Sequence, residues 1–254
     1  MHITQTTPHR RTSLAAGILF LVTFIASIPA LALFQPVLDD PAGWIAGNGG
    51  TGGIELGALL ELVTILANIG TAIVLFPLLR RTDEALSLGY IGARVVECTF
   101  MAVGLVSVLG IVSLRADDPT NGPLAVSLAA TKDWTFLLGP GVMAGIGNGL
   151  ILGTLLYRAR LLPRWMTMLG IVGGPVLAAA GIAVLFGVIE AGGFVQSLAT
   201  APEFLWEVLL GLVLTFRGFA PAVSGTRRTP RGRVRAATGA PDPHRAADAT
   251  AATR

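Results

Sequence analysis

The chain has 254 residues, of which 53% are hydrophobic and 13% are charged, and its formal net charge is +3. Soluble domains carry about 25% charged residues, so a water-soluble fold of this size has no means of burying so much apolar surface. The basic residues lie in loops and in a tail rather than on one folded face, which argues against nucleic acid as a partner. The composition predicts a protein whose partner is the lipid bilayer.

Six apolar stretches reach or approach the length of about 20 residues that crosses a bilayer as a helix. In chain order they are Ser13 to Phe34, Ile54 to Leu79, Leu86 to Leu114, Trp134 to Tyr157, Met166 to Ile189 and Pro202 to Phe219. The sequence therefore predicts an all-α polytopic bundle of six spans over residues 13–219, between an N-terminal segment, 1–12, and a C-terminal tail, 220–254.

Arginines fix the predicted orientation, because short cytoplasmic loops are rich in Lys and Arg. The N-terminal segment, the second and fourth loops and the C-terminal segment all carry arginines, whereas the opposite side has only Arg115 and Lys132. Both termini are expected to be cytoplasmic. The first apolar run ends in Ala30-Leu31-Ala32, a pattern that signal peptidase can cleave; cleavage would leave five spans, but an uncleaved first span is the preferred interpretation.

The second span carries a polar face, since Gly57, Glu61, Thr64, Asn68 and Thr71 recur at helical spacing. Intramembrane charges usually face the bundle interior or a wet cavity, so this face is expected to point inward.

The third span contributes Arg94 and Glu97, which lie three residues apart and can pair along the helix. If they do not pair with each other, Asn68 is the first partner expected for Glu97. The single cysteine, Cys98, excludes an intrachain disulfide.

The fourth span is predicted to begin at Trp134, with Asp133 as its N-cap. A series of glycines then recurs at every fourth position, and small residues at this spacing let two helices approach closely. The series consists of Gly141, Gly145, Gly149 and Gly153, with Asn148 beside it. Close packing is the preferred role.

The sixth span is predicted to begin with a capping box from Thr200 to Glu203, with Trp206 in an interfacial aromatic belt. Glu207 lies one turn deeper than Glu203, at a depth similar to that of Glu61. The two deep carboxylates can share a proton or a ligand, although hydrogen bonding to neighbouring helices is the favoured alternative.

The tail after Phe219 is poor in apolar residues and is expected to be disordered. Its arginine cluster can contact anionic lipid headgroups, although a simple topology anchor is the favoured interpretation. The cluster consists of Arg227, Arg228, Arg231, Arg233 and Arg235.

Enzyme chemistry has little support in the sequence. All three histidines lie in the terminal segments, and no nucleophile elbow, P-loop or dinucleotide fingerprint occurs. We therefore expect no catalytic residue, no metal site and no cofactor.

Several blocks in matching order resemble the bacterial membrane family catalogued as domain of unknown function 4386. They are LGALLELVTILANIGTAIVLFPLLRR, LGYIGARVVE, DWTFLLGPG, LLYRARLLPRWMTMLGIVGGPVL and FLWEVLLG, and the resemblance spans Ser13 to Phe219. It implies a multi-pass protein of the bacterial cytoplasmic membrane and brings no activity with it. The positions that match the family's polar pattern are Glu61, Asn68, Arg94, Glu97, Asp133, Trp134 and Glu207.

These seven residues form the candidate ligand site. The leading hypothesis is a non-enzymatic structural or small-ligand-binding bundle. The alternative is a small proton-sensitive transporter that uses the intramembrane carboxylates Glu61 and Glu207, and an intramembrane enzyme comes third.

Overall fold

The computed structural model describes residues 7–118 and 120–220, and within them all regular structure is helical. Six helical segments there are long and apolar enough to cross a membrane. This confirms the predicted all-α bundle of six spans. The terminal residues 1–6 and 221–254 lie outside this part of the chain, so the disordered tail and its contact with lipid headgroups stay predictions.

Five spans are single helices, and one is composite. The single helices are α1 (Thr7–Asp39), α3 (Gly52–Leu79), α4 (Glu84–Asp117), α7 (Arg164–Leu185) and α8 (Phe194–Phe216). The composite fourth span joins α5 (Gly122–Phe136), η1 (Leu137–Met143), η2 (Gly145–Leu152) and α6 (Gly153–Ala159). A short helix, α2 (Pro41–Ile45), connects α1 to α3.

The middle of the fourth span is π-helical in η1 and η2. Pro140 lies inside η1 and has no N–H to donate to the preceding turn, and the glycine-rich sequence around it offers little side-chain packing to hold a regular α-helix. Wide π-helical turns occur often at functional sites. Here they lie beside the buried polar residues described below.

Two helix starts that the sequence predicted are wrong. The fourth span begins at Gly122, so Asp133 lies well inside α5 and does not cap it. The sixth begins at Phe194, so Thr200 lies inside α8, where its hydroxyl donates to the Gln196 carbonyl at 2.8 Å. In both cases the helix extends beyond the most apolar part of its sequence, because hydropathy marks the stretch that crosses lipid and not the first hydrogen-bonded turn.

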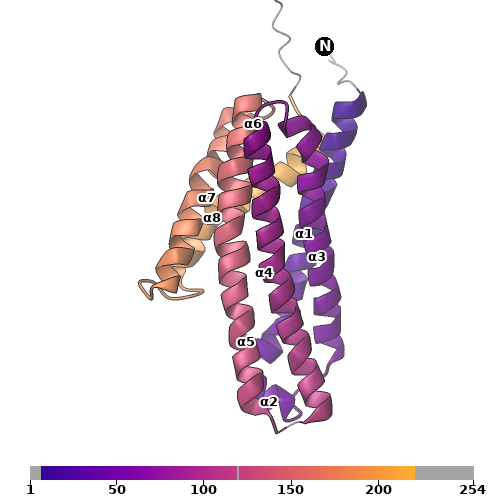
Figure 1. The fold of residues 1–254 in the computed structure, drawn as a ribbon, viewed down its shortest axis with the longest axis vertical. Coiled ribbons are helices and arrows are strands. Elements are labelled where there is room, and N and C mark those ends of the chain that lie inside the picture. Colours follow the sequence, from indigo (N-terminus) through magenta and orange to yellow (C-terminus); the bar gives the residue numbers. More distant parts are fainter. Residues whose placement is uncertain (1–6, 119, 221–254) are drawn as a thin grey trace, which may run out of the picture. The chain divides into compact units, whose positions relative to one another are not determined.

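The six spans form a closed ring of neighbours. Helix α1 packs against α3 and α8, α7 packs against α8 and η2, and α4 packs against α3 and the fourth span. Figure 1 shows α4 and α5 running together past the end of the α7–α8 pair to a tip where α2 packs against α5. Each span therefore presents one face to the interior of the ring and one face outward.

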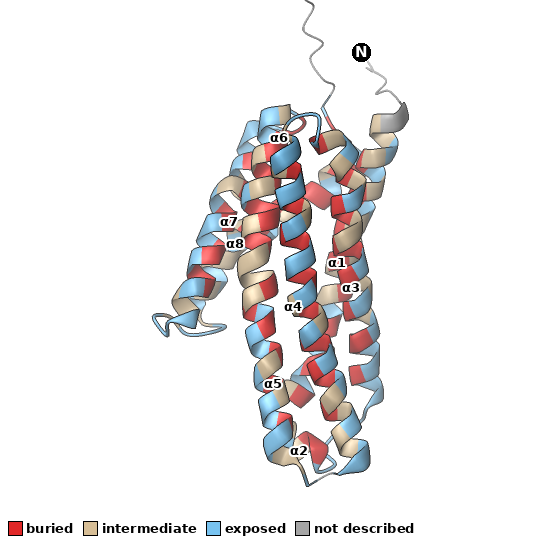
Figure 2. Ribbon diagram, in the orientation of Figure 1, coloured by how far each residue is buried: buried red, intermediate tan, exposed pale blue. Residues whose placement is uncertain are grey.

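Outward faces are apolar, as expected for helices in lipid. In Figure 2 the exposed and buried residues form separate stripes along each helix. The exposed large side chains within the described residues include Ile25, Leu66, Val106 and Phe216. A surface of this kind fits a hydrocarbon environment. In lipid the hydrophobic effect does not drive helix association, and close packing and polar contacts hold the helices together.

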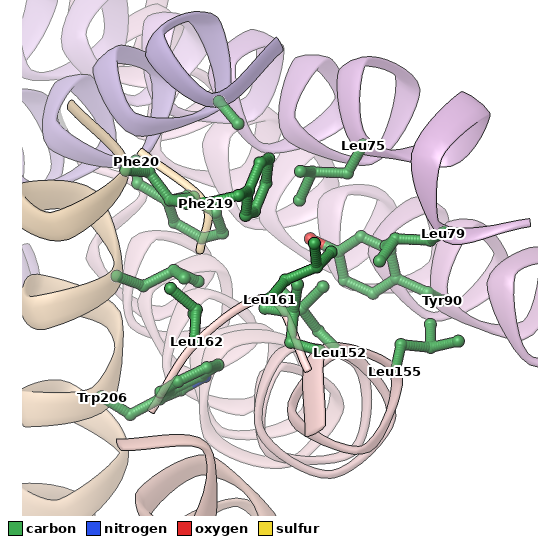
Figure 3. Packing of buried hydrophobic residues seen from close by; sticks show 14 of the residues in the cluster. Phe20, Leu75, Leu79, Tyr90, Leu152, Leu155, Leu161, Leu162, Trp206 and Phe219 are labelled. Carbon is green, nitrogen blue, oxygen red and sulfur yellow. The ribbon is translucent and has the colours of Figure 1, made fainter. Parts of the chain in front are cut away.

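Two apolar clusters fill much of the interior. One contains Phe20, Tyr90, Leu152 and Trp206, and Figure 3 shows these side chains gathered from several helices. The other contains Phe34 and lies in the half next to α2. Trp206 is fully buried, so its predicted place in an interfacial aromatic belt is wrong. Along the sequence of the helices, polar residues lie between the residues that belong to one cluster and those that belong to the other.

Glycines bring η2 and α7 into direct backbone contact, as the series in the fourth span predicted. A methyl group on Gly145 would overlap the carbonyl oxygen of Gly174, and one on Gly149 would overlap the Gly174 Cα. Gly153 lies against the backbone of Ile171 in the same way. The structure confirms the packing role of these three glycines.

Candidate functional site

A three-residue polar cluster lies between α3 and α4. The Arg94 guanidinium donates to Glu97 Oε2 at 2.8 Å and to Asn68 Oδ1 at 2.5 Å. The Asn68 amide in turn donates to Glu97 Oε1 at 3.4 Å. Arg94 is 2% exposed and Glu97 is 3% exposed, so neither side chain reaches an interface. The predicted pairing of Arg94 with Glu97 is confirmed, and Asn68 joins it.

The cluster forms because the polar face of α3 points inward. Glu61, Thr64, Asn68 and Thr71 are all buried, and Gly57 packs against Phe34 of α1. The 3–4 residue spacing aligns them on one side of α3, where Gly57 meets α1, Glu61 meets α5 and Asn68 meets α4. The predicted inward direction of this face is confirmed.

Glu61 has a partner that the sequence did not indicate. The Lys132 ammonium on α5 donates to Glu61 Oε1 at 2.5 Å, and it lies 5.1 Å from the centre of the Phe34 ring. Both charged side chains are buried. A buried pair of this kind offsets the loss of hydration only through close contact and additional polar or aromatic neighbours.

Glu207 belongs to a different group, centred on Asn148 in η2. The Asn148 amide donates to Glu207, and the Tyr90 hydroxyl donates to Asn148 Oδ1 at 3.3 Å. The Trp206 indole N–H donates to the Asn148 carbonyl at 3.2 Å. Asn148 therefore links η2 to α4 and α8.

Glu203, one turn before Glu207 on α8, differs from every other buried acid. It is 2% exposed, yet neither carboxylate oxygen has a hydrogen-bond partner in the described part of the chain. An unsatisfied buried polar group is expensive, and a charged one more so. Glu203 also lies against Gly149 and Gly173, where side chains would leave it no room.

The unpartnered carboxylate of Glu203 lines a cavity of about 190 Å³ at the centre of the bundle, here called the central cavity. All six spans contribute to its wall. Its polar residues are Thr23, Ser27, Thr64, Asn68, Arg94, Glu97, Thr200, Glu203 and Glu207, and its aromatic residues are Phe20, Phe24, Phe136 and Phe204. A space of this size holds several waters or one small molecule.

Two other cavities adjoin it. A space of about 40 Å³ beside Glu61 and Lys132, the lysine cavity, shares Ser27, Thr64 and other lining residues with the central cavity. A wider space of about 790 Å³, the loop pocket, lies between the α7–α8 loop and α5. It shares Phe136, Thr200 and Phe204 with the central cavity.

The seven predicted site residues fall into three groups. Four of them line the central cavity: Asn68, Arg94, Glu97 and Glu207. Glu61 lines the lysine cavity, so it and Glu207 do not share one cavity wall as their similar depth implied. Asp133 is exposed in the loop pocket, and Trp134 is 48% exposed on the outer surface, away from the central cavity.

Sequence reasoning missed two residues of this interior. Lys132 is not among the predicted site residues, although Ala125, Ala129, Lys132 and Thr135 follow one another at helical spacing and are all buried. That spacing was the available signal. The sequence predicts Glu203 as part of a capping box, although its four-residue spacing from Glu207 places both carboxylates on one helix face.

Metal coordination has no support in the described residues, where no group of three or more His, Cys, Asp or Glu side chains is placed to hold an ion. The site is instead a set of hydrogen-bonded charges around an interior cavity. This arrangement suits reversible binding through charge and hydrogen bonds better than nucleophilic chemistry.

The fold and the site together define a polytopic membrane protein with a polar interior. The chain belongs to the family described as Domain of unknown function (DUF4386), whose model matches residues 15–218 and so includes most of the first span and the whole of the other five. Neither a curated protein nor a solved structure matches this chain.

Proposed function

We propose that this protein is a non-enzymatic membrane protein that binds a small ligand in the central cavity. The observation that carries the proposal is Glu203, a buried carboxylate without a hydrogen-bond partner in the described residues, on the wall of a cavity of about 190 Å³. In a purely structural cluster each polar group would be expected to have a hydrogen-bond partner, because an unpaired buried acid opposes folding. A ligand that contacts Glu203 removes that penalty.

The remaining polar residues of the cavity have defined roles in this proposal. Arg94, Glu97 and Asn68 satisfy one another, so they form a rigid wall, whereas Glu203 is left available for the ligand. A rigid wall reduces the entropy lost on binding. A site of about 190 Å³ lies below the roughly 300–1,000 Å³ typical of pockets for drug-sized molecules, so the ligand is small.

The experiment is a thermal-shift screen of small amines, acids, alcohols and amino acids on the purified full-length protein and on Ser27→Phe. Ser27 lines the central cavity, so the added ring should occupy it. Ile25→Phe on the exposed side of α1 is the matched control. At least one compound should raise the melting temperature of the wild type and of the control, but not of Ser27→Phe.

A second filling variant, Thr200→Phe from α8, serves if Ser27→Phe does not fold. If no compound distinguishes the filled variants from the wild type, the polar interior has only a structural role and the proposal is wrong.

A small proton-sensitive transporter is the second candidate. It is favoured by the succession of spaces from the loop pocket to the central cavity, with Phe136, Thr200 and Phe204 between them. Such a carrier should show pH-dependent uptake into proteoliposomes that disappears in Glu61→Gln or Glu207→Gln. Binding without pH-dependent flux would leave the binding protein as the function.

We also propose that the protein lies in the bacterial cytoplasmic membrane with both termini on the cytoplasmic side. The loop arginines support this orientation through the positive-inside rule, and the six apolar helical segments support a location in a membrane.

A further inference from the structure

The charged groups around the central cavity are mainly acidic. Glu97, Glu203 and Glu207 line it together with one cation, Arg94. Arg94 already donates to Glu97 and Asn68 through its two Nη atoms, and its Nε atom has no hydrogen-bond partner in the described residues. Glu207 has only the neutral Asn148 as a hydrogen-bond donor, and Glu203 has none in the described chain. Neither of these two carboxylates forms an ion pair within the described chain.

The remaining wall is aromatic. Phe20, Phe24, Phe136 and Phe204 line the cavity, and the rings of Phe24 and Phe204 meet edge to face at 5.3 Å between centroids. The faces of aromatic rings attract cations, more strongly where water is excluded. Carboxylates and phenyl rings together suit an ammonium group that carries a short alkyl chain.

The loop pocket, which adjoins the central cavity, also carries negative charge. The loop pocket is lined by Gln35, Asp133, Gln196 and Ser197 among other residues, with one acid and no basic side chain. A pocket that carries charge of one sign raises the local concentration of the opposite ion. Cations are therefore favoured both in the loop pocket and in the cavity that adjoins it.

We propose that the ligand of the central cavity is a small organic cation, an alkylammonium or a compound of that class, whose charge is bound by Glu203 and Glu207. This inference rests on the proposed function, since it names the ligand class of the same site. The alkyl part would lie against Phe24 and Phe204. Entry would occur from the loop pocket, past Phe136, Thr200 and Phe204.

The test compares three probes of similar size on the full-length protein in lipid nanodiscs: n-butylammonium chloride, 1-butanol and sodium butyrate, at constant ionic strength. Only n-butylammonium should raise the melting temperature, and the shift should saturate. At 100 times the dissociation constant the shift should be about 5–10 °C for a chain of this size.

Three variants locate the binding site. Glu203→Gln and Glu207→Gln should each weaken n-butylammonium binding by about tenfold or more, because each removes a charge-assisted hydrogen bond. Glu55→Gln makes the same change at an exposed position of α3, and it should bind like the wild type. The Glu203 variant should fold, because its carboxylate has no partner to lose in the described chain. If it does not fold, Glu207→Gln carries the test, since an amide oxygen still accepts from Asn148.

The outcomes separate this inference from the proposed function. Binding of butanol or butyrate that depends on Glu203 would contradict the proposal that the ligand is a cation. It would still support a ligand site in the central cavity. An equal n-butylammonium shift of the melting temperature in all variants would be a salt effect, and it would also contradict the proposal that the ligand is a cation. If no probe shifts the melting temperature, the proposal of a cationic ligand is wrong. The proposed function is tested separately: it is wrong if no compound of the wider screen distinguishes the filled variants from the wild type.

Discussion

Removal of one partner of the Arg94–Glu97 pair should destabilise the protein strongly. Arg94→Met leaves Glu97 buried without a cation, and Glu97→Leu leaves the Arg94 guanidinium without its acceptor at 2.8 Å. Breaking a buried pair in this way typically costs about 3–5 kcal/mol, because an uncompensated charge stays in the interior. We expect a loss of this size from each single variant.

The double variant removes both charges and leaves Asn68 as the only strongly polar group of the cluster. It should therefore lose about 3 kcal/mol less than the sum of the two single variants, the upper end of the coupling range for residues in contact. That difference corresponds to about 6–12 °C in melting temperature for a chain of this size.

The measurement is reversible unfolding in mixed micelles, which gives the free energy of unfolding for all four proteins. Arg158→Met is the control, because Arg158 pairs with Asp83 at 3.0 Å with its side chain 56% exposed. Exposed pairs contribute about 0–1 kcal/mol, so this variant should lose no more than that. Additivity of Arg94→Met and Glu97→Leu within about 0.5 kcal/mol would refute the reasoning.

Three further predictions concern packing, the second ion pair and orientation. Gly145→Leu should abolish folding, because its side chain would overlap the Gly174 backbone, whereas Gly92→Leu has open space and should give a normal yield; equal yields would contradict this. Lys132→Met should lower the melting temperature, and adding Glu61→Gln should restore part of the loss, which a thermal melt of the two variants will show; no recovery would mean that the pair is not coupled. Orientation can be measured with single cysteines in a Cys98→Ser background and an impermeant thiol reagent. The cysteines replace Asn48, Gly193 and Thr82. The first two should react from outside intact cells and the third should not; labelling of the third alone would reverse the orientation.

The amino-acid sequence by itself determined which segments enter the membrane and which helix faces look inward. Hydropathy is a local property, so six spans follow from it directly. Glu61 and Asn68 lie seven residues apart, and Arg94 and Glu97 three apart, and such spacings fix a common helix face whatever the helix meets. The close contact at Gly145 also follows from local composition.

Partner choice between helices was decided only by the tertiary structure. Lys132 meets Glu61, and Asn148 meets Glu207, across more than fifty residues of sequence. Such pairs depend on the rotation, tilt and end of each helix, and none of these is set by local hydropathy. Glu203 is the clearest case. In the first turn of a helix it would face water, but α8 begins nine residues earlier. Glu203 therefore lies on the wall of the central cavity, without a hydrogen-bond partner in the described residues.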